Sequence, residues 1–240
     1  MEKVKEYFDD FTFHARVVPV LVILLPIIVL GICKGVVGEN ILQIPLYTIV
    51  SIIFLAFTAR IARELGKKYE EKMYIELKGM PTTIILRYSD NTLNSVTKRR
   101  YHEKLNKIVD GVVLPIQERD ENIDSDEQYR AAINWLRNYA NSNRETEFRV
   151  YQELKEYNFW RNLYGSRFIA IGLYILITIR EILLINNFDF KEFITKPSPT
   201  YIPLIIMMIS IILFLAVNKK TIKRKAFDYA KSLVEVCERL

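Results

Sequence analysis

Apolar residues along this chain gather in four long runs, arranged as two pairs on either side of a polar middle region. The runs are residues 17–33, 40–59, 168–185 and 197–218. A helix needs about 20 mostly apolar residues to cross about 30 Å of hydrocarbon, so each run predicts one membrane-spanning helix. The alternative, buried helices of a soluble protein, is disfavoured because core helices rarely lack charge over such lengths. The pattern therefore predicts a mainly α-helical integral membrane protein with four transmembrane helices, paired as hairpins at residues 17–59 and 168–218.

The third run is the one that contains charged residues, Arg180 and Glu181. Its uncharged part, residues 168–179, rises only about 18 Å at 1.5 Å per residue, so both side chains would fall in the outer half of a bilayer. One interpretation is an early helix end, with both side chains snorkelling outward to the interface. The other is a polar pair that faces a water-filled interior and lines a pore. The sequence does not choose between them.

The orientation follows from the distribution of basic residues. Most of the 34 Lys and Arg residues lie in the N-terminal segment, the middle region and the C-terminal tail, whereas the two short connections carry only Lys34, Lys191 and Lys196. Because basic residues favour the cytoplasmic side, we expect a multi-pass plasma-membrane protein with both termini and the middle region in the cytoplasm. The predicted organisation is a cytoplasmic N-terminal segment (1–16), a transmembrane hairpin (17–59), a cytoplasmic domain (60–167), a second transmembrane hairpin (168–218) and a basic, amphipathic cytoplasmic tail helix (219–240).

The spacing of apolar residues predicts a mostly helical cytoplasmic domain. The second span is expected to continue as a charged helix to Leu77. Further helices are predicted over Ser95–Val109, from Ser125 to about Ala140, and from near Glu145 into the third span. Ser125 followed by Gln128 has the spacing of a capping box. Residues 82–88 are β-prone, and with residues 112–114 they fit either a short two-stranded element or a simple extended segment.

Basic residues cluster directly after the fourth span, at the start of the tail helix. The cluster is Lys219, Lys220, Lys223, Arg224 and Lys225. Each basic residue near the surface contributes about 1 kcal/mol of attraction to anionic lipid, so the cluster is predicted to contact lipid head groups; the alternative is a role in topology and solubility alone. The apolar stripe of the tail helix fits packing on the cytoplasmic domain, on the bilayer or on another subunit.

No catalytic, cofactor-binding or metal-binding motif is recognisable. His102 is followed by Glu103 but has no second histidine four residues on, so the zinc-protease pattern is absent. The acidic run from Glu118 to Glu127 lacks the glycine and the final glutamate of a calcium loop. The middle region is only mildly basic once its acidic residues are counted, so direct nucleic-acid binding is not expected. We therefore expect a protein that is not an enzyme and that carries no cofactor or metal.

A set of residue types in the middle region is shared with a known class of proteins. The residues are Lys78-Gly79-Met80-Pro81-Thr82-Thr83, Leu86-Arg87, Arg100-Tyr101-His102, Leu105, Asp126, Tyr129, Leu136-Arg137 and Tyr157-Asn158-Phe159-Trp160-Arg161-Asn162-Leu163-Tyr164-Gly165. They lie within residues 77–167, less than half the chain. In this pattern the chain resembles prokaryotic anti-phage defence membrane effectors, the four-helix transmembrane proteins associated with short Argonaute or nucleotide-signalling defence systems.

The resemblance implies an effector of abortive infection that stays silent until a cytosolic sensor protein or complex signals invasion. It then disrupts the membrane as a homo-oligomer, with Arg180 and Glu181 as candidates to line the pore. In the resemblance, Arg87, Arg100, Arg137 and Arg161 would receive the signal or partner. Independently of it, the basic cluster Lys98, Arg99 and Arg100 fits either a face for a partner or a second lipid-contacting surface; the alternative is a role in topology and solubility alone. The competing hypothesis is a constitutive small channel, or a membrane scaffold that recruits a cytosolic complex.

Overall fold

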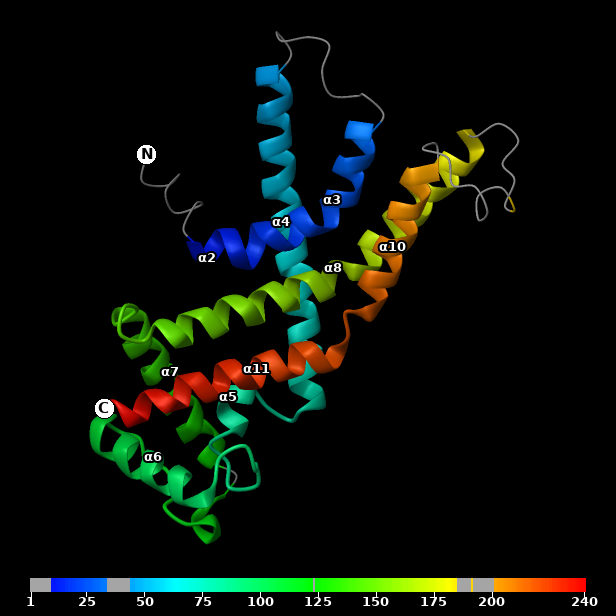
Figure 1. The fold of residues 1–240 in the computed structure, drawn as a ribbon. Helices are drawn as coiled ribbons and strands as arrows, with labels where there is room; N and C mark the ends of the chain where they lie inside the picture. The colour runs from blue at the N-terminus through cyan, green and yellow to red at the C-terminus, as the bar shows by residue number, and fades with distance from the viewer. Residues whose placement is uncertain (1–9, 34–43, 123, 185–190, 192–200) are drawn as a thin grey trace. The chain divides into compact units, whose positions relative to one another are not determined.

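Helices form the regular structure of this chain, as the spacing of its apolar residues predicts. The computed structural model describes residues 10–33, 44–122, 124–184, 191 and 201–240 (Figure 1). It is 82% helical and contains no strand in those segments, which confirms the mainly helical fold class. The chain divides into two compact units. Unit 1 contains Met1–Tyr69 and Phe159–Lys219, and unit 2 contains Glu70–Asn158 and Lys220–Leu240.

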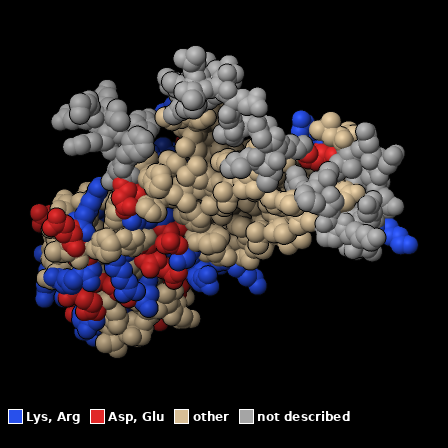
Figure 2. All heavy atoms as spheres, turned by 45° about the horizontal axis from the view of Figure 1, so that its top comes forward, with Lys and Arg blue, Asp and Glu red and all other residues tan. Residues whose placement is uncertain are grey.

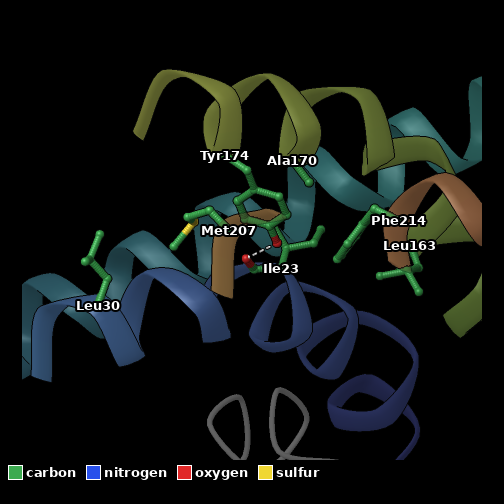
Figure 3. Packing of buried hydrophobic residues seen from close by; sticks show 7 residues of the cluster. All are labelled: Ile23, Leu30, Leu163, Ala170, Tyr174, Met207 and Phe214. Atoms are coloured by element: carbon green, nitrogen blue, oxygen red, sulfur yellow. Dashed lines mark hydrogen bonds between the residues drawn. The ribbon is translucent and has the colours of Figure 1, made fainter. Parts of the chain in front are cut away.

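Unit 1 is built from the apolar helices. Its elements are α2 (Asp10–Thr12), the π-helical turn η1 (Phe13–Val17), α3 (Val18–Cys33), most of α4 (Ile44–Glu76), the second part of α8 (Phe148–Leu184) and α10 (Ile202–Ala216). Helices α3, α8 and α10 share a core, drawn in Figure 3, of Ile23, Leu30, Leu163, Ala170, Tyr174, Met207 and Phe214. The connections that carry Lys34 and Lys196, and most of the predicted N-terminal segment, lie outside the described residues.

Helices α4 and α8 meet at two glycines. A Cβ built on Gly165 would lie 2.5 Å from the backbone nitrogen of Gly66, and one built on Gly66 would lie 2.5 Å from Asn162 Oδ1. Real Cβ atoms essentially never approach other atoms this closely, so the contact depends on glycine at both positions. The rings of Tyr69 and Tyr164 pack together with their centroids 4.3 Å apart. Such small residues, which let helix backbones approach, are typical of helix contacts in membranes.

A proline removes a backbone donor from the first helix, and a side chain of α8 supplies another. Pro19 has no N–H to donate to the carbonyl of Ala15, four residues earlier. Asn162 Nδ2 donates to that carbonyl at 2.7 Å. Asn162 is fully buried, and an unpaired buried carbonyl is costly, so this hydrogen bond stabilises the first helix against α8.

A second proline lies inside α3, and α8 again provides a donor beside it. The ring of Pro26 crowds the preceding turn of its helix. In that turn the hydroxyl of Tyr174 donates to the carbonyl of Ile23 at 2.6 Å, shown as a dashed line in Figure 3. Figure 1 shows the first helix changing direction along α3. Neighbouring side chains that pair with carbonyls in this way are what make proline tolerable in membrane helices.

Unit 2 contains the polar part of the chain. Its elements are the last turns of α4, α5 (Pro81–Ile84), α6 (Ser95–Ile108), the 3₁₀ turn η3 (Glu118–Asp120), α7 (Ser125–Ser142), the first part of α8, α11 (Lys219–Val234) and the 3₁₀ turn η5 (Glu235–Glu238). Helix α4 ends within one residue of the predicted Leu77, where Lys78 and Gly79 adopt φ angles of 56° and 153°. The helices predicted from Ser95 and Ser125 are confirmed, whereas α8 begins at Phe148 rather than near Glu145.

The described residues contain no strand, so the two-stranded alternative for residues 82–88 and 112–114 is wrong, and residues 82–88 do not form a simple extended segment either. The β-prone segment begins instead with the short helix α5, whose four residues are all buried. Pro81 occupies the first turn of this helix, where its fixed φ favours helical geometry and its missing N–H costs nothing. In residues 112–114, the other segment of the proposed pair, the backbone of Leu114 forms hydrogen bonds with the side-chain amide of Asn106 instead of with a second strand. This amide accepts from the backbone N–H of Leu114 at 2.6 Å and donates to the carbonyl of Leu114 at 2.9 Å.

The predicted capping box is also wrong, because another residue takes its place. The backbone N–H of Ser125 donates to Asn122 Oδ1 at 3.0 Å, and the N–H of Asn122 donates to Ser125 Oγ at 3.0 Å. Gln128 instead accepts from the backbone N–H of Val113 at 3.0 Å. This bond holds an irregular segment against α7. The spacing of Ser and Gln thus marked the helix start correctly but assigned the wrong hydrogen bonds.

The tail packs within unit 2, which selects one of the three alternatives left open by the sequence. Ile222, Ala230 and Leu233 of α11 are completely buried, as is Cys237 of η5, a free thiol whose pKa is raised to about 12 by burial. Lys104 Nζ on α6 donates to the carbonyl of Cys237 at 2.7 Å. Fully burying one aliphatic side chain contributes roughly 1.5–3 kcal/mol, so the tail is an integral part of this unit's core.

Burial of His102 predicts that unit 2 loses stability in acid. The ring is completely buried, Nδ1 lies 2.7 Å from the carbonyl of Pro115, and burial lowers the pKa of His102 below its usual 6.5. Below pH ~6.5 the unfolded chain therefore binds a proton that the folded chain does not, so the free energy of unfolding should fall with decreasing pH, by up to about 1.4 kcal/mol per pH unit. Above that pH the contribution is fully present.

Denaturant unfolding between pH 7.5 and 5, followed by fluorescence of Trp135 on α7, measures this dependence. The variant His102→Gln should show a flatter curve over the same interval, because its side chain does not titrate there. Parallel curves for the two proteins would contradict the prediction, since other titrating groups would then account for the acid sensitivity.

Candidate functional site

The basic residues predicted to receive a signal are dispersed, and most are used in structural contacts. Arg87 donates from Nε and Nη2 to the carboxylate of Asp126, at 2.8 and 2.6 Å, and from Nη2 to the carbonyl of Lys78 at 2.9 Å. The hydrogen bonds with Asp126 raise the pKa of Arg87. This bidentate pair connects the segment after α5 to the first turn of α7.

Lys98 is almost completely buried at the start of α6, with 1% of its surface exposed. Its ammonium group donates to the carbonyl of Arg87 at 2.6 Å and to the carbonyl of Asp90, and burial lowers the pKa of Lys98. It thereby closes the turn between α5 and α6. The neighbouring Arg99 is exposed and pairs with Glu103 at 2.9 Å, one turn further along the helix.

The remaining candidates lie in different places. Arg100 pairs with Glu238 of η5. Arg161 belongs to unit 1, where it is 7% exposed and its Nε and Nη2 each lie 3.3 Å from Asn162 Oδ1. Arg137, on α7, lines a cavity. The structure therefore does not bring the predicted basic residues together, and Arg137 is the member that lines the cavity.

The cavity lies in unit 2, where α7, α8 and α11 meet, and has a volume of about 150 Å³. It is lined by Arg137, Ala140, Asn141, Arg144, Val150, Tyr151, Leu154, Tyr229 and Leu233. Arg137 Nη2 donates to Thr82 Oγ1 at 3.1 Å. Burial raises the pKa of the Tyr229 hydroxyl, and the positive charge of Arg137 opposes that increase. The cavity thus combines cationic, amide and aromatic groups in one place.

Sequence reasoning did not identify Arg144, Asn141 or Tyr151 as candidate site residues. A partial signal was present, because positions 137, 141 and 144 have helical spacing, although α7 ends at Ser142 and Arg144 lies just beyond it. The guanidinium of Arg144 lies 5.6 Å from the centroid of the Tyr151 ring, a cation–π distance. That contact involves the next helix of the chain, so spacing along α7 alone does not reveal it.

The basic residues at the start of α11 are largely exposed. Lys220, Lys223 and Arg224 are solvent-accessible, whereas Lys225 is partly buried and pairs with Glu156 at 3.5 Å. Lys219 is exposed at the boundary of unit 1. Four members of the predicted lipid-binding cluster are thus accessible to a partner.

Arg180 and Glu181 have different environments at the end of α8. Arg180 Nη1 lies 2.8 Å from Glu181 Oε1, yet the Arg180 side chain is 64% exposed and that of Glu181 only 5%. The carboxylate thus faces the interior of unit 1, and the guanidinium faces outward. Both sequence interpretations of this pair stay predictions.

The structure supports fewer membrane spans than the sequence predicts. In the part of the chain that it describes, one helix, Asp10–Gly31, is long and apolar enough to cross a membrane; α10 and α11 make a second candidate if counted together as one bent span. This is weak evidence, because core helices and signal sequences have the same length and composition. A helix compatible with a membrane is therefore present, and the four-span topology is a proposal.

Comparison with known proteins gives no assignment: no family model, curated protein or solved structure matches this chain. Within the described segments, no group of three or more His, Cys, Asp or Glu side chains is arranged to hold a metal ion.

Proposed function

We propose that this chain is a multi-pass plasma-membrane protein whose four apolar helices span the bilayer, with both termini and unit 2 in the cytoplasm. The observation that carries the proposal is the apolar surface of unit 1. Phe57 on α4, Leu176 on α8 and Leu213 on α10 are each more than 60% exposed, among many similar residues. In Figure 2 the visible surface of unit 1 bears few charged residues, whereas charges gather over unit 2. Exposed apolar surface of this extent is typical of contact with lipid.

In that membrane the protein acts as an effector of a prokaryotic abortive-infection system, without a catalytic step of its own. Unit 2 receives a signal from a cytosolic sensor, and a homo-oligomer of unit 1 then disrupts membrane polarity. The resemblance of residues 77–167 supports this role. Helices α4 and α8 each contribute to both units without interruption, which supports coupling between signal and membrane. Coupling of this kind requires two states whose balance the partner shifts.

Two groups of residues have roles in this proposal. The exposed basic residues of α11, with Lys225, contact anionic lipid. Arg180 and Glu181, which pair at the end of α8, are the candidate pore lining. Neither role requires the residues to move within one chain.

A membrane-potential dye in cells that express the chain tests the function. Depolarisation should appear when the neighbouring operon and its trigger are present, and should be absent when the chain is expressed alone. The double variant Arg180→Leu, Glu181→Leu should reduce the response. Its matched control is Arg130→Gln, an exposed arginine on α7 in unit 2.

Each alternative gives a different result in this assay. A constitutive channel depolarises the membrane with or without the operon, which would refute gating. A scaffold never depolarises it. An unchanged response in the double variant would exclude Arg180 and Glu181 from the ion pathway.

A further inference from the structure

The cavity between α7, α8 and α11 has two arginines whose charges are not neutralised by carboxylates. Arg87, Arg100 and Arg239 each form an ion pair with Asp or Glu. Among the residues that the structure describes, neither Arg137 nor Arg144 does so. Positive charge left unpaired beside a concave surface is the usual mark of an anion site.

The orientation of Arg137 points to the same conclusion. Its Nε is buried and has no acceptor among the described residues, while Nη2 donates to Thr82. Buried donors are nearly always paired in native proteins, so an orphaned guanidinium nitrogen beside a cavity indicates a group that binds there. Glu70 raises the pKa of Tyr229, whereas Arg137 lowers it. The carboxylate of Glu70 accepts hydrogen bonds from the hydroxyls of Tyr74 and Tyr157.

A third cation lies close to the cavity. Lys155 is 7% exposed, and its ammonium nitrogen lies 5.1 Å from the centroid of the Tyr151 ring. The same ring contacts the guanidinium of Arg144. Tyr151 thereby holds two cations near one wall of the cavity, and the amide of Asn141 adds a neutral donor.

We infer that this cavity binds the phosphate group of a small soluble phosphate ester. A planar carboxylate is satisfied by one guanidinium fork, whereas a tetrahedral phosphate offers oxygens to donors from several directions. Arg137 and Arg144 supply forks from two points of the chain, with Asn141 as a further donor. The cavity's volume suits a single head group, and its aromatic and aliphatic lining suits the adjoining part of the ester. The role of this ligand as a trigger rests on the proposed function. Binding of the ligand to the cavity does not depend on that role.

The test uses the full chain in phosphatidylcholine nanodiscs, with phenyl phosphate as the probe and saturation-transfer NMR as the readout. Phenyl phosphate should bind saturably, inorganic phosphate should displace it, and benzoate at equal concentration should bind less tightly. Loss of one charge-assisted fork is worth roughly tenfold in affinity. Arg144→Gln should therefore weaken binding about tenfold and Arg144→Lys by a smaller factor, because lysine keeps the charge and loses the fork.

The matched control is Arg130→Gln, an exposed arginine on α7 outside the cavity, which should bind phenyl phosphate like the wild type. Equal weakening in Arg130→Gln and Arg144→Gln would overturn the proposal, because the probe would then sense only net charge. Absence of saturable binding would overturn it too.

A lipid arm separates the two sources of phosphate. Adding phosphatidylglycerol to the nanodiscs should leave the affinity for phenyl phosphate unchanged in the wild type. If the anionic lipid displaced the probe, and did so only when Arg144 was intact, a lipid head group would be the occupant and the proposal would fail. Binding without any depolarisation in cells would instead refute the proposed function and leave the site intact.

Discussion

Replacing Gly165 by alanine should destabilise unit 1 by about 3 kcal/mol, the upper end of the range for overpacked contacts. The added Cβ would lie 2.5 Å from the backbone nitrogen of Gly66, and 2.6 Å from the carbonyl carbon of Leu65. Backbone atoms in a helix cannot rotate away as a side chain can, so α4 and α8 must separate. Thermal unfolding of the full chain in detergent, followed by fluorescence of Trp160 on α8, measures the effect.

Gly172→Ala provides the matched control, with the same substitution on the same helix. A Cβ at Gly172 meets nothing within 4 Å. Alanine should therefore stabilise that position by roughly 0.5–1 kcal/mol through its higher helix propensity. Opposite signs for the two variants would support the close crossing. If both variants were stabilised, α4 and α8 would not be in contact at Gly165.

The comparison of the two glycines shows why spacing along the chain predicts helices better than it predicts their contacts. Spacing along the chain located α6, α7 and α8 and, through opposite charges three and four residues apart, the continuation of α4, because each is a local pattern of about 3.6 residues. The same pattern does not show which helices pack against one another. Gly66 and Gly165 lie a hundred residues apart in the sequence, and only the fold brings them together.

The incorrect prediction for residues 82–88 in unit 2 has a related cause. Residues 82–88 contain β-branched side chains, and that composition outweighed Pro81 in the prediction. The proline in the first turn favours a helix instead, and Asn106 then provides the hydrogen bonds that a second strand would have made. A side chain that substitutes for a strand leaves no periodic signal in the sequence.

The candidate site was predicted only in part for the same reason. The resemblance selected Arg87 and a basic cluster selected Lys98, yet Arg87 is paired with Asp126, 39 positions away, and Lys98 is buried against backbone carbonyls. Whether an arginine is free to bind a ligand depends on which carboxylates the fold places beside it. Arg137, predicted to receive a signal or partner, lines the cavity, and its predicted role stays a prediction. Arg144, seven positions further on, is recognisable as a cavity residue only from its contact with the Tyr151 ring and from the packing of α11 beside it.

Replacing Asn162 by alanine should cost about 2 kcal/mol, because the buried carbonyl of Ala15 then loses its donor. The size of that loss should depend on residue 19. In the background Pro19→Ala, residue 19 regains a backbone N–H, and α-helical hydrogen bonding in place of the π-helical pattern of η1 would direct it at the same carbonyl, four residues earlier. The cost of Asn162→Ala should then fall by about 1 kcal/mol, which a double-mutant cycle measures directly as the coupling energy.

Pro26→Ala serves as the control background for this cycle. Residue 26 is seven positions from Pro19, about 10 Å along the helix, and Tyr174 rather than Asn162 donates beside it. Asn162→Ala should cost the same in this background as in the wild type, since sites this far apart without shared partners act additively. Equal coupling of Asn162 to both prolines would mean that either substitution straightens the whole helix. The hydrogen bond to Ala15 would then not compensate specifically for Pro19.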